Sequence, residues 1–122
     1  MLLDSNILIY FSKPGDEFLA RWVGDPAAAV SIVSQIEALG FPELTQMESE
    51  AIEHALQSLP AHPVTDAIAK QSIALRRQRR MKLGDAIIAA TALAIGAELV
   101  TRNIDDFRHI AGLRVINPFE GR

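Results

Sequence analysis

Short, mostly apolar runs alternate along the chain with longer stretches in which apolar residues recur at helical spacing. Runs of this kind are typical of strands in a parallel sheet that is buried on both faces. Strands are predicted at residues 1–3, 28–33, 63–64, 98–101 and 113–116. The stretches between them predict helices at residues 7–11, 18–23, 36–39, 45–59, 66–81 and 84–95. This alternation predicts an α/β fold, with a short, mainly parallel sheet between two helical layers, in a single domain over residues 1–122.

Polar residues with capping chemistry mark where several of these helices begin. Ser5 or Asn6 is the expected cap of the first helix, and Ser34 that of the third. Thr45 begins the fourth helix with Glu48 three residues later, which is the capping-box pattern.

Apolar spacing predicts which helix faces are buried. Residues 47, 51, 55 and 59 fall four apart and are expected to form the buried face of the fourth helix. The helix at 84–95 is rich in alanine on nearly every face, which predicts a crowded interior position, and Gly96 is its expected C-terminal cap.

The composition argues against several kinds of functional site and binding partner. The chain has no cysteine, so a disulfide framework, a thiolate metal centre and a cysteine nucleophile are excluded. Its 12 basic and 15 acidic residues give a formal charge of −3, which argues against a generally basic nucleic-acid or membrane binder. No apolar run reaches the ~18 residues of a membrane span. The start of the chain carries no basic, signal-like segment. A cytoplasmic protein without membrane contact is expected.

Acidic residues follow the predicted strands. Asp4 comes directly after the first strand, Glu37 shortly after the second and Asp106 after the fourth, while Asp85 opens the last long helix. Ligands of parallel sheets bind beyond the carboxyl ends of the strands, where these side chains are expected to gather. Carboxylate oxygens at close quarters suit Mg²⁺ or Mn²⁺, with which a site of this kind can hydrolyse phosphate esters.

Four segments resemble, in order and spacing, the motifs of PIN-domain ribonucleases, and most of all VapC-type toxins of toxin–antitoxin pairs. They are LLDSNILIY at 2–10, SQIE at 34–37, GDAIIAATA at 84–92 and TRNIDDF at 101–107. The resemblance covers residues 1–118 and implies a PIN-like α/β/α sandwich. It further implies a Mg²⁺- or Mn²⁺-dependent endoribonuclease that uses Asp4, Glu37, Asp85 and Asp106 as metal ligands. The implied partners are RNA, a VapB-type antitoxin and a second copy of the chain, in a homodimer or a toxin–antitoxin hetero-oligomer.

The fourth acidic position is open between neighbouring residues. Relatives place an acid either where Asn103 stands or just before the Phe, and Asp106 is favoured because Asn103 lacks the charge. Asp105 is expected to point elsewhere if this turn begins a helix. Hydrogen-bonding support for the carboxylates is expected from Ser5, Asn6, Ser34, Thr101 and Asn103.

A basic run ends the helix predicted at 66–81. Arg76, Arg79, Arg80 and Lys82 lie in it, and Arg102 stands beside the fourth motif. These side chains are predicted to contact the RNA backbone, against the alternative that the run is a solvated helix end.

Two other functions remain as alternatives. A haloacid-dehalogenase-type phosphatase also places an Asp after its first strand, but needs a second Asp where this chain has Asn6. A non-catalytic PIN-like module that binds RNA or protein would be expected to lose one or more of the four acids.

Overall fold

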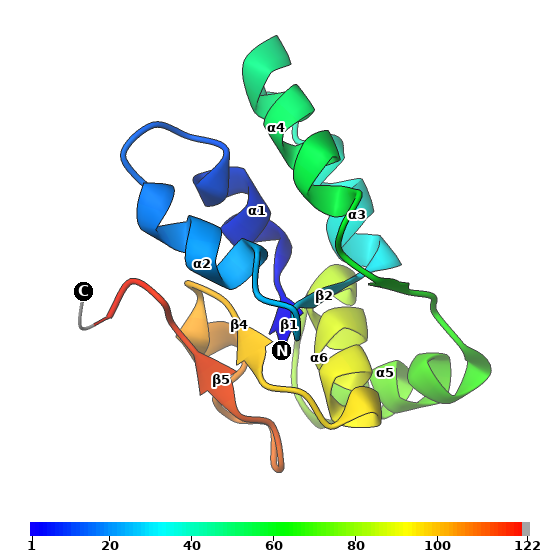
Figure 1. Ribbon diagram of the computed structural model, residues 1–122. Helices are drawn as coiled ribbons and strands as arrows, with labels where there is room; N and C mark the ends of the chain where they lie inside the picture. Colours follow the sequence, from blue (N-terminus) through cyan, green and yellow to red (C-terminus); the bar gives the residue numbers. More distant parts are fainter. Residues whose placement is uncertain (121–122) are drawn as a thin grey trace.

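A five-stranded parallel sheet runs through the middle of the molecule (Figure 1). The structure is a computed structural model that describes residues 1–120. The spatial order of the strands is β3-β2-β1-β4-β5, and every neighbouring pair is parallel. The strands are β1 (Leu2–Leu3), β2 (Ala29–Ser31), β3 (Ala61–His62), β4 (Leu99–Val100) and β5 (Val115–Ile116). Because all five are parallel, their carboxyl ends meet at one edge of the sheet.

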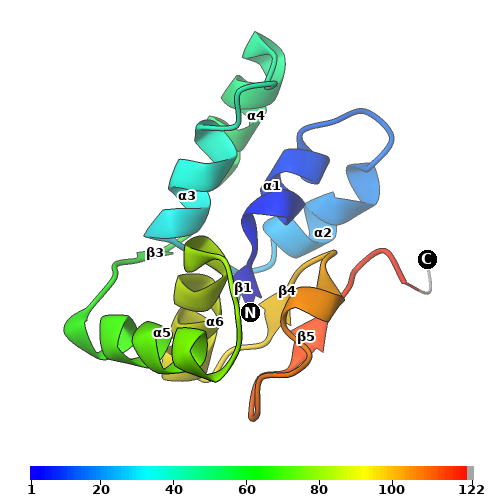
Figure 2. The same cartoon turned by 180° about the vertical axis from the view of Figure 1, so that it is seen from behind.

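Helices cover both faces of this sheet. They are α1 (Ser5–Phe11), α2 (Ala20–Val23), α3 (Ile32–Leu39), α4 (Gln46–Leu56), α5 (Asp66–Gln78) and α6 (Leu83–Ile95), with 3-10 turns η1 (Glu17–Leu19) and η2 (Ile104–Asp106). Helices α5 and α6 lie together on one side of β1, and α1 to α4 lie on the other side (Figures 1 and 2). The predicted three-layer α/β/α sandwich is confirmed.

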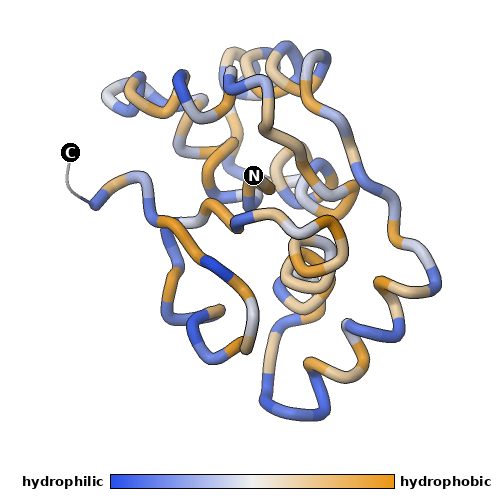
Figure 3. Tube along the Cα trace, turned by 60° about the horizontal axis from the view of Figure 1, so that its bottom comes forward, coloured by the Kyte–Doolittle hydropathy of each residue, from blue (hydrophilic) through white to orange (hydrophobic). Residues whose placement is uncertain are grey.

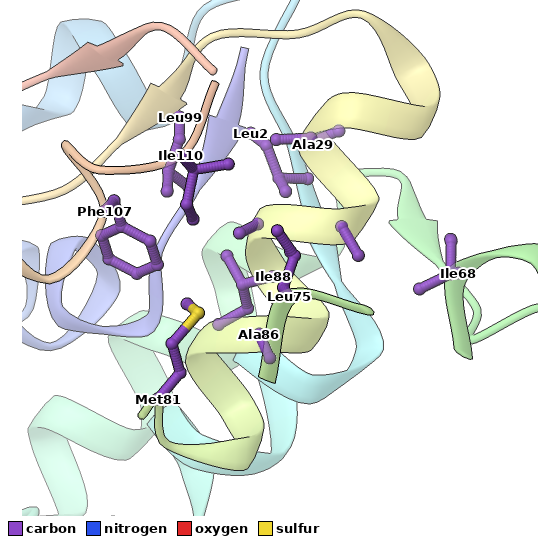
Figure 4. Close-up of a cluster of buried hydrophobic side chains, with 13 residues drawn as sticks. Leu2, Ala29, Ile68, Leu75, Met81, Ala86, Ile88, Leu99, Phe107 and Ile110 are labelled. Atoms are coloured by element: carbon purple, nitrogen blue, oxygen red, sulfur yellow. The ribbon is translucent and has the colours of Figure 1, made fainter. Parts of the chain in front are cut away.

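Two apolar clusters hold the layers together, one on each face. Leu2 points into the cluster formed with α5, α6 and Phe107 (Figure 4). The next residue, Leu3, points into the cluster formed with α1, α3 and α4. This alternation follows from the strand period of two. Hydrophobic colours accordingly run through the middle of the trace in Figure 3, and hydrophilic colours lie mostly on its outer turns.

The boundary between β2 and α3 differs from the prediction. The apolar run at 28–33 suggests one strand, but the strand ends at Ser31 and α3 begins at Ile32. The Ser31 side chain accepts a hydrogen bond of 3.1 Å from the Val33 backbone N–H, so Ser31 caps the helix. The prediction that Ser34 is the cap is wrong. Ser34 is buried within α3 and donates to the Leu3 carbonyl oxygen at 3.3 Å.

Three other predictions near helix ends need correction. Asp4, rather than Ser5 or Asn6, caps α1. Strand β3 lies at Ala61–His62, just before the predicted position at 63–64. Met47 is 81% exposed, and the buried residue of α4 is Ile52. The Thr45–Glu48 capping box and the left-handed C-cap Gly96, with φ of 64°, are confirmed.

Helix α5 ends earlier than predicted, at Gln78. Arg79 has an extended backbone, so 79–82 form a connection to α6 rather than a last helical turn. No helix within residues 1–120 is long and apolar enough to cross a membrane.

Candidate active site

Asp4 lies at the carboxyl end of the central strand β1 and is 4% exposed. Its Oδ1 accepts a hydrogen bond of 2.8 Å from the Ser5 backbone N–H. Its Oδ2 accepts bonds from the Thr101 hydroxyl at 2.8 Å and from Asn6 Nδ2 at 3.4 Å. Burial raises the pKa of Asp4, the bonds from Thr101 and Ser5 lower it, and the charge of Glu37 raises it again. The net direction is upward, so the hydrogen bonds do not fully offset the cost of burying this carboxylate.

Thr101 links the two central strands beside Asp4. It follows β4, is fully buried, and accepts hydrogen bonds from Asn6 Nδ2 at 3.2 Å and the Asn103 backbone N–H at 3.1 Å. Asn6 Oδ1 also accepts a bond of 3.3 Å from the Arg102 backbone N–H. This network fixes the orientation of the Asp4 carboxylate, as the sequence predicts for Ser5, Asn6 and Thr101. Asn103 contributes to it through its backbone.

Glu37 projects from α3 toward the first turn of α6. The space that a Cβ on Gly84 would need is filled by the Glu37 carboxylate, whose Oε2 would collide with it. Burial raises the pKa of Glu37, the Ser5 hydroxyl lowers it, and the charge of Asp85 raises it. Glu37 is therefore close enough to Asp4 and to Asp85 to feel both charges.

Asp85 stands in the first turn of α6, and its pKa is strongly raised. Burial, followed by the charges of Asp4 and Asp106, raises its pKa to about 6 from an ordinary value of 3.8. Lys82 opposes this shift but makes no ion pair with Asp85 within the described chain. Asp85 therefore interacts electrostatically with each of the other three acidic residues.

Asp105 and Asp106 are neighbours in η2 but have different surroundings. The charge of Asp106 acts on Asp85, whereas Asp105 pairs with Arg108 and its side chain is 85% exposed. Asn103 precedes η2 and makes no side-chain capping bond. This arrangement supports Asp106 as the fourth acidic residue, and that assignment stays a prediction.

The resemblance to ribonucleases predicts that Asp106→Asn lowers RNA cleavage at least about tenfold, in the range of changes around metal ligands. Asp105→Asn is the matched control, because it removes the neighbouring charge from the same 3-10 turn and is expected to change cleavage less than twofold. Initial cleavage rates of the two variants show whether Asp106 or Asp105 is the fourth acidic residue. The reverse order would assign the fourth position to Asp105.

The donor set fits a hard divalent cation. All four candidates are carboxylates, and none forms an ion pair with a basic side chain in residues 1–120. In their present positions, no three acidic or histidine side chains of that range converge on one point. Oxygen-only ligands around a shared negative charge are the chemistry that Mg²⁺ and Mn²⁺ require.

A cavity of about 280 Å³ joins this acidic edge to the basic connection between α5 and α6. Its lining includes Arg79, Arg80, Lys82, Asp85 and Asp106. The early end of α5 places these three basic residues beside the carboxylates. Arg76 is not among the lining residues and donates to the Met81 carbonyl oxygen at 3.4 Å.

His109 is a cavity residue that the sequence argument misses. It lines the same cavity as Asp85 and Asp106, and both ring nitrogens are buried without a hydrogen-bond partner. The chain offers no ligand-like spacing around the three histidines, so sequence alone carries no signal for it.

Arg102 lies on the other side of η2, in a second groove that also includes Asp106. Its guanidinium carbon is 4.8 Å from the ring centre of Tyr10 and 4.2 Å from that of Phe119. The two rings hold the guanidinium by cation–π contact, which keeps a positive charge beside the fourth motif.

Known proteins are similar to this chain in sequence and in fold. A family model described as PIN domain matches residues 1–113. Ribonuclease VapC10 of Mycobacterium tuberculosis is 31% identical over 115 residues, covering 88% of this chain and 85% of the relative. A toxin–antitoxin complex from Klebsiella pneumoniae contains a chain with a TM-score of 0.79 and 35% identity, over 98% of both chains. VapBC2 from Rickettsia felis, bound to a promoter DNA fragment, shares the fold with a TM-score of 0.76 at 22% identity, over 95% and 96% of the chains.

The fold and the acidic edge of its sheet define a PIN domain, and the chain belongs to the PIN-domain family. Within that family it is similar to the VapC-type ribonuclease toxins, which confirms the resemblance found in the sequence. The family membership also rejects the haloacid-dehalogenase-type alternative.

Proposed function

We propose that this chain is a Mg²⁺- or Mn²⁺-dependent endoribonuclease that acts in the cytoplasm as the toxin of a toxin–antitoxin pair. The observation that carries the proposal is the placement of Asp4, of Glu37 against Gly84, and of Asp85 and Asp106 in one cavity, at the carboxyl edge of the parallel sheet. The raised pKa of Asp85, caused by burial and by the charges of Asp4 and Asp106, supports it. Structural carboxylates are normally paired or solvated, so a partly buried group of like charges is a candidate functional site. The similarity to Ribonuclease VapC10 supports RNA as the substrate class.

Each carboxylate has a distinct role in this proposal. Asp4, fixed by Ser5 and Thr101, and Asp85, on the first turn of α6, are the central metal ligands. Glu37 and Asp106 flank them and complete the ligand set. A bound divalent cation supplies electrostatic stabilisation of the charge that develops on the phosphodiester and activation of water. The protein contributes Asp4, fixed by its hydrogen bonds, and three carboxylates on separate elements, which would hold the cation beside the scissile phosphate.

Two basic surfaces would place the RNA across this site. Arg79, Arg80 and Lys82 border the cavity on one side of Asp106, and Arg102 lies in the groove on the other side. Phosphate contacts position RNA without specifying its sequence. These residues would therefore orient the RNA strand while the carboxylate site acts on one phosphodiester bond. Arg76 contributes its charge from the end of α5.

A VapB-type antitoxin is the proposed protein partner. The similar chain from Klebsiella pneumoniae is part of a toxin–antitoxin complex. The proposed assembly is a homodimer or a toxin–antitoxin hetero-oligomer. Ile36 on α3 and Leu83 on α6 are 66% and 58% exposed and supply apolar surface for such contacts.

The experiment that tests the substrate class measures RNA binding and cleavage in a salt series. The wild-type chain is expected to cleave RNA in Mn²⁺. Replacing Arg79 and Arg80 by Gln is expected to raise KM with little change in kcat. In EDTA, which stops cleavage, this variant is expected to lower the slope of log affinity against log salt by about 1.4, from ~0.7 for each lost contact to single-stranded phosphate.

The matched control is Arg114→Gln, because Arg114 is an exposed arginine at 3.8 Å from Glu98 and borders neither the cavity nor the groove. It is expected to leave the slope unchanged. If the Arg79 and Arg80 variant behaves like this control, the basic connection is a solvated surface and the proposed RNA path is wrong.

A further inference from the structure

Gly84 is the second residue of α6, directly before Asp85, and its missing side chain leaves room for a residue of another helix. The three atoms nearest to a Cβ built at Gly84 are Oε2, Cδ and Oε1 of Glu37, with Cδ at 3.1 Å and Oε1 at 3.5 Å. The Glu37 carboxylate from α3 thus occupies the volume that any other amino acid at position 84 would fill.

The other glycines within residues 1–120 have different surroundings. Gly15, Gly96 and Gly112 have positive φ angles, which glycine adopts without strain. A Cβ at Gly24 or Gly40 would first meet a carbonyl oxygen of the preceding helix. Gly84 has no positive φ, and the atoms that its Cβ would meet belong to a side chain of another helix. Since glycine is the least favourable helix residue after proline, helix formation does not explain its presence in α6.

We propose that Gly84 is a positioning residue that allows the Glu37 carboxylate to lie against the first turn of α6, beside Asp85. This inference rests on the proposed function and deepens it, because it states what holds Glu37 in the ligand set. Glu37 comes from α3, which follows β2, whereas Asp85 opens α6. The close approach of these two helices is what brings the second and third acidic motifs together.

The surroundings of Glu37 explain why its position depends on this space. The N-cap of α6, Lys82, makes no side-chain capping bond, so the N–H groups of the first turn have no side-chain acceptor at that position. A carboxylate is favoured near such a helix start. A methyl group at position 84 would push the Glu37 carboxylate away from this turn and from Asp85.

Gly84→Ala is therefore expected to lower RNA cleavage about 10–100-fold, because a displacement of about 1 Å at a catalytic centre can cost about 100-fold. It is expected to weaken Mn²⁺ binding at least tenfold, measured by calorimetry. The melting temperature of the metal-free protein is expected to stay the same or rise, since alanine favours the helix and the displaced atoms are the end of a flexible side chain. Loss of function without loss of stability is the signature of a positioning residue.

A double-mutant cycle with Glu37→Asp tests whether the effect acts through Glu37. Aspartate is shorter by one methylene, so it makes room for the new methyl group. Glu37→Asp alone is expected to weaken Mn²⁺ binding. In the Gly84→Ala background the same change is expected to have no effect or to restore part of the binding, because interacting positions are not additive.

Gly24→Ala is the matched control. It makes the same chemical change at the end of α2, where the Cβ would lie 3.0 Å from the Ala20 carbonyl oxygen and no acidic site residue is near. This variant is expected to keep full cleavage and full Mn²⁺ affinity.

The inference is overturned if Gly84→Ala binds Mn²⁺ and cleaves RNA like the wild type, or if it fails to fold. Additive effects in the cycle would also overturn it, because Gly84 would then act independently of Glu37. These outcomes leave the proposed function intact as long as the wild type binds Mn²⁺ and cleaves RNA. A wild-type chain that does neither would contradict the proposed function and this inference together.

Discussion

Asp85→Asn is expected to reduce RNA cleavage by more than about 100-fold while the protein stays folded. Asp85 is the acidic residue on which the charges of both Asp4 and Asp106 act, so it occupies the centre of the proposed ligand set. Changes to residues that merely support metal ligands typically cost 10–100-fold, and removal of a central ligand should cost more. Initial rates of cleavage in Mn²⁺, with circular dichroism as the check on folding, measure this effect.

The same variant is expected to stabilise the metal-free protein. Asparagine removes a charge whose pKa the fold raises to about 6, so the free energy of unfolding should increase by about 1 kcal/mol at pH 7.5 in EDTA. Asp66→Asn is the matched control, because Asp66 is an exposed acidic residue in the first turn of α5. It should leave cleavage unchanged and lower stability slightly through the lost helix-dipole interaction. If Asp85→Asn keeps wild-type cleavage, the ligand assignment is wrong.

The stability of the metal-free protein is expected to fall as the pH rises from about 5 to 7. The folded-state pKa of Asp85 is about 6 against 3.8 ordinarily, and those of Asp4 and Glu37 are also raised. The folded protein then binds more protons than the unfolded chain in this window, so the free energy of unfolding decreases with rising pH. For Asp85 the whole shift corresponds to at most about 3 kcal/mol, of which only about 1 kcal/mol falls between pH 5 and 7, and partial exposure reduces this further.

Denaturant unfolding in EDTA between pH 5 and 7.5 measures this slope. The range lies above the titration of Glu17 and Glu48, whose lowered pKa values act in the opposite direction. Added Mn²⁺ should stabilise the protein most at the upper end of the range, by about 2.7 kcal/mol at a concentration 100 times Kd. The slope should weaken in Asp85→Asn. Stability that rises with pH in EDTA would show that the carboxylates are already compensated by the protein.

The sequence predicts the layers of this fold because short apolar runs and helical spacing follow from burial. Leu2 and Leu3 point to opposite faces of a covered sheet, and a run of this kind is visible in the sequence. The boundary at Ser31 is not visible in the same way, because Ile32 and Val33 have strand propensity but begin α3. Capping by Ser31 outweighs that propensity.

The acidic residues of the site are predictable because each follows a strand or opens a helix. The role of Thr101 as a hydrogen-bond donor to Asp4 is also predictable, because it lies in the fourth motif. The role of Gly84 is not, because the contact between Gly84 and Glu37 joins distant segments and has no local pattern in the sequence. His109 reaches the cavity only through the fold of the segment after η2.

The most direct test of the central claim is RNA cleavage by the purified wild-type chain, first in EDTA and then after an excess of Mn²⁺ has been added. Asp85→Asn is measured in parallel under the same conditions. The account predicts no cleavage by either protein in EDTA, restored cleavage by the wild type in Mn²⁺, and none by the variant. Equal cleavage with and without metal, or equal restoration in the variant, would contradict a metal-dependent ribonuclease site built from these carboxylates.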